Sequence, residues 1–297
     1  MSVYLCYVWQ IAGGFMSQSP PQHSGERAFR PATLTAYGQT VERVIQSMRA
    51  NLAEPLSLEE MAEIAYLSPF HFNRVFRSIT DIPPGEFLAS LRLEAAKRLL
   101  LTTTLSVTDV CFELGYTSLG TFTTRFKQLI GLSPLQLRQM ADDLASAPMQ
   151  PLLVAHSEMR RLGAVHAKGV SGSITAPDSF RGLIFAGLFP KFISQNRPVA
   201  CTTLPASGAF QIGPAPDGRY YLLAAALPWS QNALTYLLPE RGLLVGVSEQ
   251  PVEVRGGQAN APVALTLRPL RPSDPPILGV FPPLLATPAA SRLRAAL

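Results

Sequence analysis

The sequence predicts a multidomain protein in which an all-α double helix-turn-helix domain is followed by an all-β sandwich domain. Residues 57–79 and 106–130 repeat one pattern, in which a capped short helix, a tight turn at a serine and an amphipathic second helix follow each other. After residue 148, helical periodicity gives way to short apolar runs separated by Pro, Gly and Asp. With 297 residues, 47% of them hydrophobic, the chain is long enough to bury two cores.

The predicted order starts with a lead that we expect to be flexible. It continues with a helical domain, a linker, the sandwich and a Pro-rich tail, at residues 1–37, 38–145, 146–168, 169–270 and 271–297. Within the lead, residues 3–16 are apolar but lack a basic start and are too short to span a bilayer. A start assigned too early, with Met16 as the true first residue, is favoured over a membrane anchor, so no membrane partner is expected.

The first helix-turn-helix unit follows a predicted helix at residues 40–52. Ser57 and Glu60 have the spacing of a capping box, and Ser68 precedes Pro69 at the start of the second helix. The stripe of Phe72, Val75, Phe76 and Ile79 predicts the buried face, which leaves Pro69, Phe70, Asn73, Arg74 and Arg77 outward. Arg can bond to guanine, Asn to adenine, and an exposed Phe can contact a thymine methyl group.

The second unit lies beyond a predicted connecting helix at residues 84–101. That helix would span roughly 27 Å, enough with its flanking helices to place two recognition helices about one DNA turn apart. Ser106 and Asp109 predict another capping box, and Ser118 caps the second recognition helix. Its outward residues are poorer readers of base edges than those of the first unit: Leu119, Gly120, Thr121, Thr124 and Arg125.

The prediction of DNA binding does not rest on the net charge of the helical domain. Residues 38–145 hold 10 Lys and Arg against 12 Asp and Glu, a net charge of −2, whereas residues 146–297 hold 13 against 7, a net charge of +6. The three cysteines, Cys6, Cys111 and Cys201, are too scattered for a disulfide framework or a metal site, which fits a reducing cytoplasm. Neither a catalytic set, a metal site nor a cofactor is expected.

Residues 38–140 resemble the DNA-binding domain of the AraC/XylS family of bacterial transcription regulators. The likeness is carried by Leu58, Ala62, Ser68, Phe72, Arg74, Phe76, Arg92, Ala96, Leu99, Leu100, Val110, Gly115, Tyr116, Ser118, Phe122, Phe126, Lys127, Gly131, Pro134 and Arg138. It departs from the family pattern at Asp81, where Gly is usual, at Pro83 and at Cys111.

The resemblance implies a set of DNA contacts and two kinds of partner. Base contacts are expected from Phe70, Asn73, Arg74, Gly120, Thr121 and Thr124, and backbone contacts from Ser68, Arg77, Ser118, Arg125, Lys127 and Arg138. Double-stranded DNA would be one partner, and RNA polymerase, for an activator, the other.

Eight short apolar segments predict the β-sandwich. They lie at residues 169–175, 183–189, 199–204, 209–212, 220–227, 243–247, 252–254 and 263–267. The order of these segments and the Asp217-Gly218 turn resemble transthyretin-like, or carboxypeptidase regulatory-like, sandwiches, which implies a non-catalytic module. We expect it to sense a small-molecule effector or a protein partner, in a pocket that Trp229, Tyr236 and the pair Tyr220-Tyr221 could wall.

Sequence-specific transcription regulation is therefore the leading interpretation. An architectural DNA-binding protein with weak sequence preference is the alternative, favoured by the small outward residues of the second unit. A third class, a DNA-repair methyl acceptor fused to such a domain, requires a reactive and usually metal-clustered cysteine, which the cysteine spacing does not supply.

Overall fold

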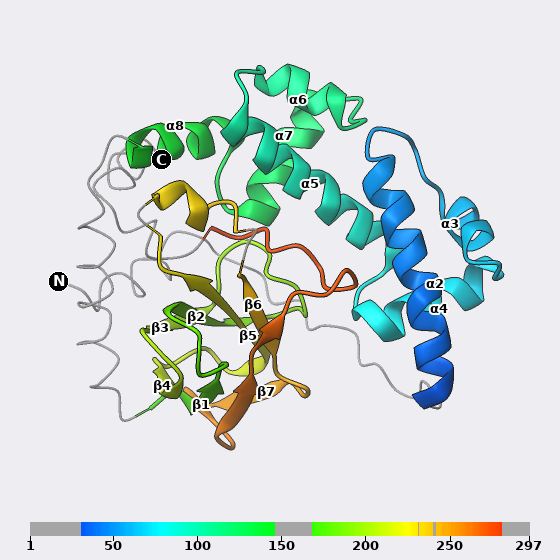
Figure 1. The fold of residues 1–297 in the computed structure, drawn as a ribbon. Helices are drawn as coiled ribbons and strands as arrows, with labels where there is room; N and C mark the ends of the chain where they lie inside the picture. The colour runs from blue at the N-terminus through cyan, green and yellow to red at the C-terminus, as the bar shows by residue number, and fades with distance from the viewer. Residues whose placement is uncertain (1–30, 146–167, 231, 240–241, 281–297) are drawn as a thin grey trace.

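The computed structural model describes residues 31–145, 168–230, 232–239 and 242–280. The predicted lead up to residue 30, the linker at 146–167 and the tail at 281–297 lie outside the described residues. The described part has a helical half and a sheet-rich half, in the predicted order (Figure 1).

Seven helices form the described N-terminal half. They are α2 (Pro31–Ala50), α3 (Leu58–Ile64), α4 (Pro69–Thr80), α5 (Pro84–Thr102), α6 (Val107–Glu113), α7 (Leu119–Ile130) and α8 (Pro134–Ala145). The two helix-turn-helix units are therefore α3 with α4 and α6 with α7, joined by α5. The expectation that the chain would enter its first helix at residue 40 was wrong, because α2 begins at Pro31, a residue that suits the first helical turn since it needs no N–H partner there.

Serine caps start the short helices as predicted. The backbone N–H of Ser57 donates to the carboxylate of Glu60 at 2.7 Å and the Glu60 N–H donates back to the Ser57 hydroxyl, while Ser106 and Asp109 form the same reciprocal box. At the recognition helices, the hydroxyl of Ser118 accepts from the N–H of Thr121, whereas Ser68 has the N-cap backbone conformation without a side-chain cap bond.

The C-terminal half contains every predicted strand. The longer ones are β1 (Val170–Thr175), β2 (Gly182–Phe189), β3 (Ala200–Leu204), β4 (Gly208–Ile212), β5 (Gly218–Pro228), β6 (Leu244–Val247), β7 (Val252–Arg255) and β9 (Val263–Thr266). The short strands β8 (Gln258–Ala259) and β10 (Arg268–Pro269) and the 3-10 helix η1 (Ala233–Tyr236) complete it.

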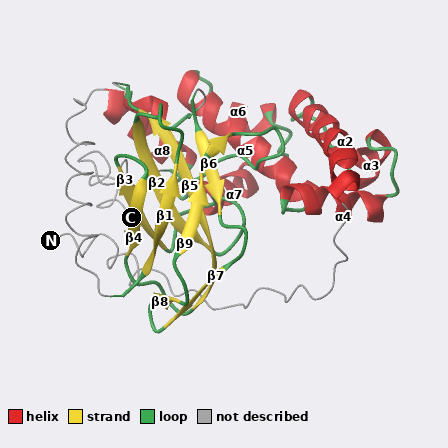
Figure 2. Ribbon diagram, turned by 60° about the horizontal axis from the view of Figure 1, so that its bottom comes forward, coloured by secondary structure: helices red, strands yellow, loops and turns green. Residues whose placement is uncertain are grey.

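The strands form two sheets. A small sheet has the order β4-β1-β9, and a larger one has the order β10-β6-β5-β2-β3, with β7 pairing β5 and β8 pairing β7. Side chains from both sheets share one buried cluster, which includes Ile174 and Phe210 of the small sheet and Leu188 and Leu222 of the larger one. The two sheets thus pack on a common core (Figure 2).

The other face of the larger sheet is also buried. It packs against α5 and α8, which share a core with the second helix-turn-helix unit. Along β2, Ile184, Ala186 and Leu188 point to the small sheet, while Leu183 and Phe185 belong to a cluster shared with α5 and α8. That shared cluster joins Leu93 and Leu100 of α5 to Leu183 and Leu227 of the sheet, so the two halves do not have separate cores.

The first unit has a core of its own. Buried residues of α2, α3, α4 and the first half of α5 form a separate cluster: Val41, Val44, Ile45, Met48, Met61, Ala62, Ala65, Phe72, Val75, Phe76, Ile82, Phe87, Leu88 and Leu91, with Ile193 from the sheet-rich half. Figures 1 and 2 show α2, α3 and α4 to one side of the sheets, while α5 and α8 lie over them.

Residues 271–280, which the sequence analysis assigned to a tail, pack against the helices. Leu278 is fully buried and Val280 is 5% exposed, both in the cluster that joins the halves. The ammonium group of Lys97 on α5, itself 3% exposed, donates to the carbonyls of Leu278 at 3.3 Å and Ile277 at 3.5 Å. In the described part of the segment predicted as a Pro-rich tail, Leu278 and Val280 therefore fill an apolar space beside the helices.

Within the described residues, no helix is long and apolar enough to span a membrane, and His, Cys, Asp and Glu side chains do not gather into a metal-binding group. Cys111 is buried in the core of the second unit, as expected, and Cys201 is half-buried.

Lys97 makes stability depend on pH. Burial lowers the pKa of Lys97 to about 8, partly opposed by nearby Glu94, whereas an unfolded lysine titrates near 10.4. Between these values the unfolded chain binds more protons, so the free energy of unfolding should rise as pH increases from about 8 to about 10. Urea denaturation across this range should show a steeper rise for the wild-type protein than for Lys97→Met. Lys127→Met, at an exposed lysine, is the control and should keep the wild-type slope.

Candidate nucleic-acid interface

Helix α4 presents the side chains predicted to read bases. Phe72, Val75 and Phe76 of its apolar stripe are fully buried and Ile79 is partly buried. The Phe72 and Phe76 rings meet edge to face at 5.5 Å, and Phe76 packs likewise on Phe87. Burial of that stripe turns the opposite side outward, so that Phe70 is 81% exposed and Arg74 is exposed beside it. This side of α4 therefore presents an apolar ring and a guanidinium group, the two kinds of group that can contact a thymine methyl group and a guanine.

The remaining predicted residues of the first unit surround that pair. Ser68 is exposed at the start of α4, and Asn73 and Arg77 are half-buried. Sequence reasoning missed Tyr66, which is 84% exposed in the turn before α4 and has a φ of 55°. The Arg43 guanidinium lies 5.8 Å from its ring centroid. Its position in the turn between α3 and α4 was the sequence feature that could have predicted its exposure.

Helix α7 exposes small polar groups at the equivalent positions. Phe122, Phe126 and Ile130 are buried, which leaves the predicted residues Gly120, Thr121, Thr124, Arg125 and Lys127 exposed. A Cβ added at Gly120 would meet only the Ser118 hydroxyl, at 3.8 Å, so this edge of the helix is open. The outward face of α7 therefore allows a partner to come close to the helix backbone and presents hydroxyl groups. The outward face of α4 presents large side chains instead.

Arg138 differs from the other predicted backbone contacts. It is half-buried, and its Nε and Nη2 atoms donate to the carbonyls of Leu100 at 3.1 Å and Leu105 at 2.7 Å. Arg92 makes the same kind of clamp on the carbonyls of Leu52 and Glu54. Arg92 thus fixes the segment that follows α2, and Arg138 fixes the end of α5 and the segment that follows it. A phosphate contact by Arg138 stays a prediction, but its donors already have partners.

The two recognition helices end in the same way at positions 50 residues apart. Asp81 follows α4 with a φ of 62°, and Gly131 follows α7 with a φ of 90°. Gly adopts this left-handed backbone without cost, whereas a residue with a Cβ is strained there, and Asp is among the better tolerated. Burial raises the pKa of Asp81 to about 6.

The aromatic residues expected to wall an effector pocket do not meet in one cavity. Trp229 is 45% exposed, and Tyr236 is buried against the helices with its hydroxyl accepting from the Ser230 N–H. The Tyr220 hydroxyl donates to the Pro216 carbonyl, and Tyr221 packs edge to face on Phe192.

Comparison with known proteins places the helical half in a family. A family model described as a helix-turn-helix domain matches residues 61–140. The HTH-type transcriptional activator AarP of Providencia stuartii is 33% identical over 94 residues, which is 32% of this chain and 70% of AarP. The chain belongs to the AraC family of transcriptional regulators.

Two further proteins are similar to this chain over a comparable share of its length. The bifunctional transcriptional activator/DNA repair enzyme AdaA of Bacillus subtilis is 33% identical over 101 residues, covering 34% of this chain and 48% of AdaA. A crystal structure of the DNA-binding domain of AdpA in complex with a target DNA is 32% identical, covers 33% of this chain and 89% of that one, and has a TM-score of 0.32. The chain thus spans about half the length of AdaA.

The strained cap at Asp81 predicts a stabilising substitution. Asp81→Gly should raise the free energy of unfolding by about 0.5 to 1 kcal/mol at pH 7, because Gly adopts the left-handed backbone without a Cβ clash. The folded pKa of Asp81, about 6, exceeds the unfolded value near 3.9, so wild-type stability should also fall as pH rises from about 4 to about 6.

Asp81→Asn is the matched control for both effects. It keeps a side chain that tolerates the left-handed backbone but cannot titrate, so it should lose the pH dependence without the full gain in stability. Thermal unfolding of the three proteins between pH 4 and 7 measures both. A destabilised Asp81→Gly would show that the Asp side chain does more than end the helix.

Proposed function

We propose that this protein is a sequence-specific DNA-binding transcriptional regulator that places α4 and α7 in successive major grooves. The strongest support is the 81% exposed Phe70 beside the exposed Arg74, on a helix whose opposite face is packed into the core through Phe72, Val75 and Phe76. Such a pair supplies an apolar contact for thymine and a bidentate donor for guanine. AraC-family membership gives this surface its role.

The proposal makes the two units unequal. Phe70, Asn73 and Arg74 supply most of the base readout, while Gly120, Thr121 and Thr124 let α7 approach the groove closely with little side-chain discrimination. Ser68, Arg77, Ser118, Arg125 and Lys127 contact the phosphate backbone, because they are polar and lie along the same two helices. Arg138 is left out of this set, since it is bonded to carbonyls.

The sheet-rich half takes a regulatory role in this proposal. We regard its two packed sheets as a transthyretin-like β-sandwich without catalytic function, which senses a small-molecule effector. The protein then acts on promoters in the cytoplasm, as an activator that contacts RNA polymerase. The two sheets on one core support the sandwich, and the cluster shared with α5 and α8 supports a regulatory connection.

Readout by Arg74 predicts a position-specific loss. On a site enriched from a random DNA library, Arg74→Ala should weaken binding by about 1 to 3 kcal/mol and relax the preference at one base position. Lys127→Ala should weaken binding to all sequences alike and lower the salt dependence. Arg255→Ala, at an exposed arginine on β7, is the control and should change neither. A larger loss of specificity from Thr121 or Thr124 variants than from Arg74→Ala would assign the readout to α7.

The alternative is an architectural protein, which the small side chains of α7 favour. Competition binding against bulk DNA separates the two functions, because a regulator should prefer its enriched site by about 10³-fold or more. The control is a scrambled sequence of equal length and base composition. Equal affinity for the enriched and scrambled sequences would establish the architectural function.

A further inference from the structure

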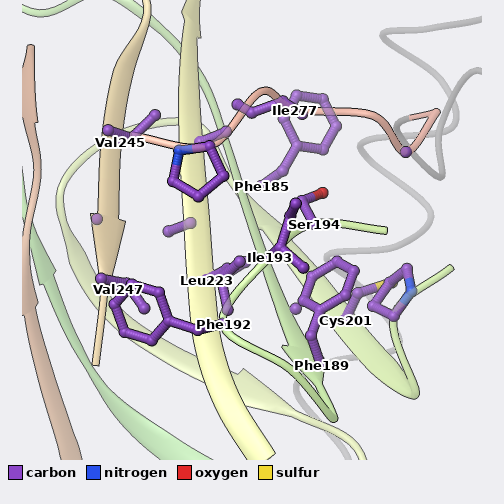
Figure 3. Close-up of a pocket in the computed structure, with 18 of the residues that line it drawn as sticks. Phe185, Phe189, Phe192, Ile193, Ser194, Cys201, Leu223, Val245, Val247 and Ile277 are labelled. Carbon is purple, nitrogen blue, oxygen red and sulfur yellow. The ribbon is translucent and has the colours of Figure 1, made fainter. Parts of the chain in front are cut away.

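The larger sheet carries a cavity of about 110 Å³ on its helix-facing side, next to the cluster that joins the two halves. Strands β2, β3, β5 and β6 form its floor, with Phe185 and Phe189 of β2 and Leu223, Val245 and Val247 from the neighbouring strands (Figure 3). None of the tyrosines or tryptophans singled out from the sequence lines it.

Two segments, residues 190–198 and 270–280, cover this floor and are called the roof below. The first contributes Phe192 and Ile193, and the second contributes Ile277 (Figure 3). The N–H groups of Leu278 and Gly279 both donate to the carbonyl of Ser194, at 3.2 and 3.1 Å. The two segments are therefore bonded into one structure.

The roof also contacts both helix-turn-helix units. The N–H of Asn196 donates to the carbonyl of Leu129 in the last turn of α7. Ile193, 2% exposed, lies in the core of the first unit with α2, α4 and α5. The ammonium group of Lys191 and the amide of Gln195 both reach one carboxylate oxygen of Glu86, in the first turn of α5, at 2.9 and 3.5 Å.

The same roof residues thus line the cavity and touch the DNA-binding helices. Ile193 and Asn196 do both. A molecule that fills the cavity must contact or displace groups that fix the last turn of α7 and the first turn of α5. Because α5 joins the two units, a change there alters how α4 and α7 are placed relative to each other.

The lining selects an uncharged ligand. Its charged residues are Arg268 and Asp274, which bond to each other through two contacts of 2.7 Å and so need no ligand charge. Ser194, Asn196, Cys201 and Thr202 supply a few polar groups among aromatic and aliphatic side chains. An apolar cavity of about 150 Å³ takes up benzene, so this cavity of about 110 Å³ has room for a ligand built on one small ring.

We infer that this cavity binds a small neutral aromatic or alicyclic molecule with at most one or two hydrogen-bonding groups, and that its occupancy changes the affinity for DNA through the roof. The site requires only the cavity, whereas the coupling rests on the proposed DNA-binding function. Coupling between two such sites is typically 5- to 150-fold in affinity.

Calorimetric titration of the full chain tests the site without DNA, with phenol and cyclohexanol as probes and benzoate as the charged comparison. We expect saturable binding of at least one neutral probe and weaker binding of benzoate. Cys201→Phe places a ring in the cavity and should weaken binding at least tenfold. Val199→Phe, at an exposed position two residues away, is the matched control and should bind as the wild type does.

Three results would overturn the site. The first is the absence of both a heat of binding and a thermal stabilisation with the neutral probes. The second is binding of benzoate as tight as that of phenol, and the third is unchanged binding of the neutral probe by Cys201→Phe. In each of them the cavity is not the neutral-ligand site inferred here, whatever the protein does with DNA.

A second measurement tests the coupling. The dissociation constant for the enriched DNA site should change at least fivefold, in either direction, when the neutral probe that binds is saturating. Glu86→Ala removes the carboxylate that the roof contacts, so it should keep the affinity for the probe and reduce that change. An unchanged dissociation constant for DNA would refute the coupling. Absence of DNA binding with and without the probe would refute both the proposed function and the coupling, and leave the site itself to the calorimetry.

Discussion

The burial of one face of α5 and α8 against the larger sheet is the contact on which the architecture depends. Leu93, Leu100 and Met140 share a core with Leu183 and Leu227. Separating the second helix-turn-helix unit from the sheet-rich half would therefore expose apolar side chains of both to water. Two domains joined only by a flexible linker would each complete a core alone. Here the burial of each half's apolar surface stabilises the other.

This shared core makes the two helix-turn-helix units physically unlike although their sequences repeat. The first unit packs around its own phenylalanines, and its buried cluster also includes Ile193 from the sheet-rich half. The second is joined to the sheet through α5 and α8. The unit with the larger outward side chains is therefore also the one that shares fewer buried residues with the sheet-rich half, while the unit with small outward side chains is packed against that half.

Much of the local structure could be predicted because it depends on neighbours in the chain. Capping boxes at Ser57 and Ser106 need partners three residues away, and the buried stripe of α4 follows from helical periodicity. The strands were recognisable because each is a short apolar run with turn residues at both ends. Long-range contacts were not predictable in this way. Leu278, in the segment predicted as a Pro-rich tail, is fully buried, and two donors of Arg138, whose phosphate contact stays a prediction, reach the carbonyls of Leu100 and Leu105.

The sequence by itself determined the repeated units, the strand positions and the outward side chains of α4 and α7, because each follows from spacing along a helix or strand. Only the tertiary structure decided which surfaces the two halves share, that Lys97 is buried beneath residues 277 and 278, and that Phe185, Phe189 and Phe192 surround a cavity. These features join residues up to 181 positions apart. Their pairing depends on how the layers pack, which no local periodicity encodes.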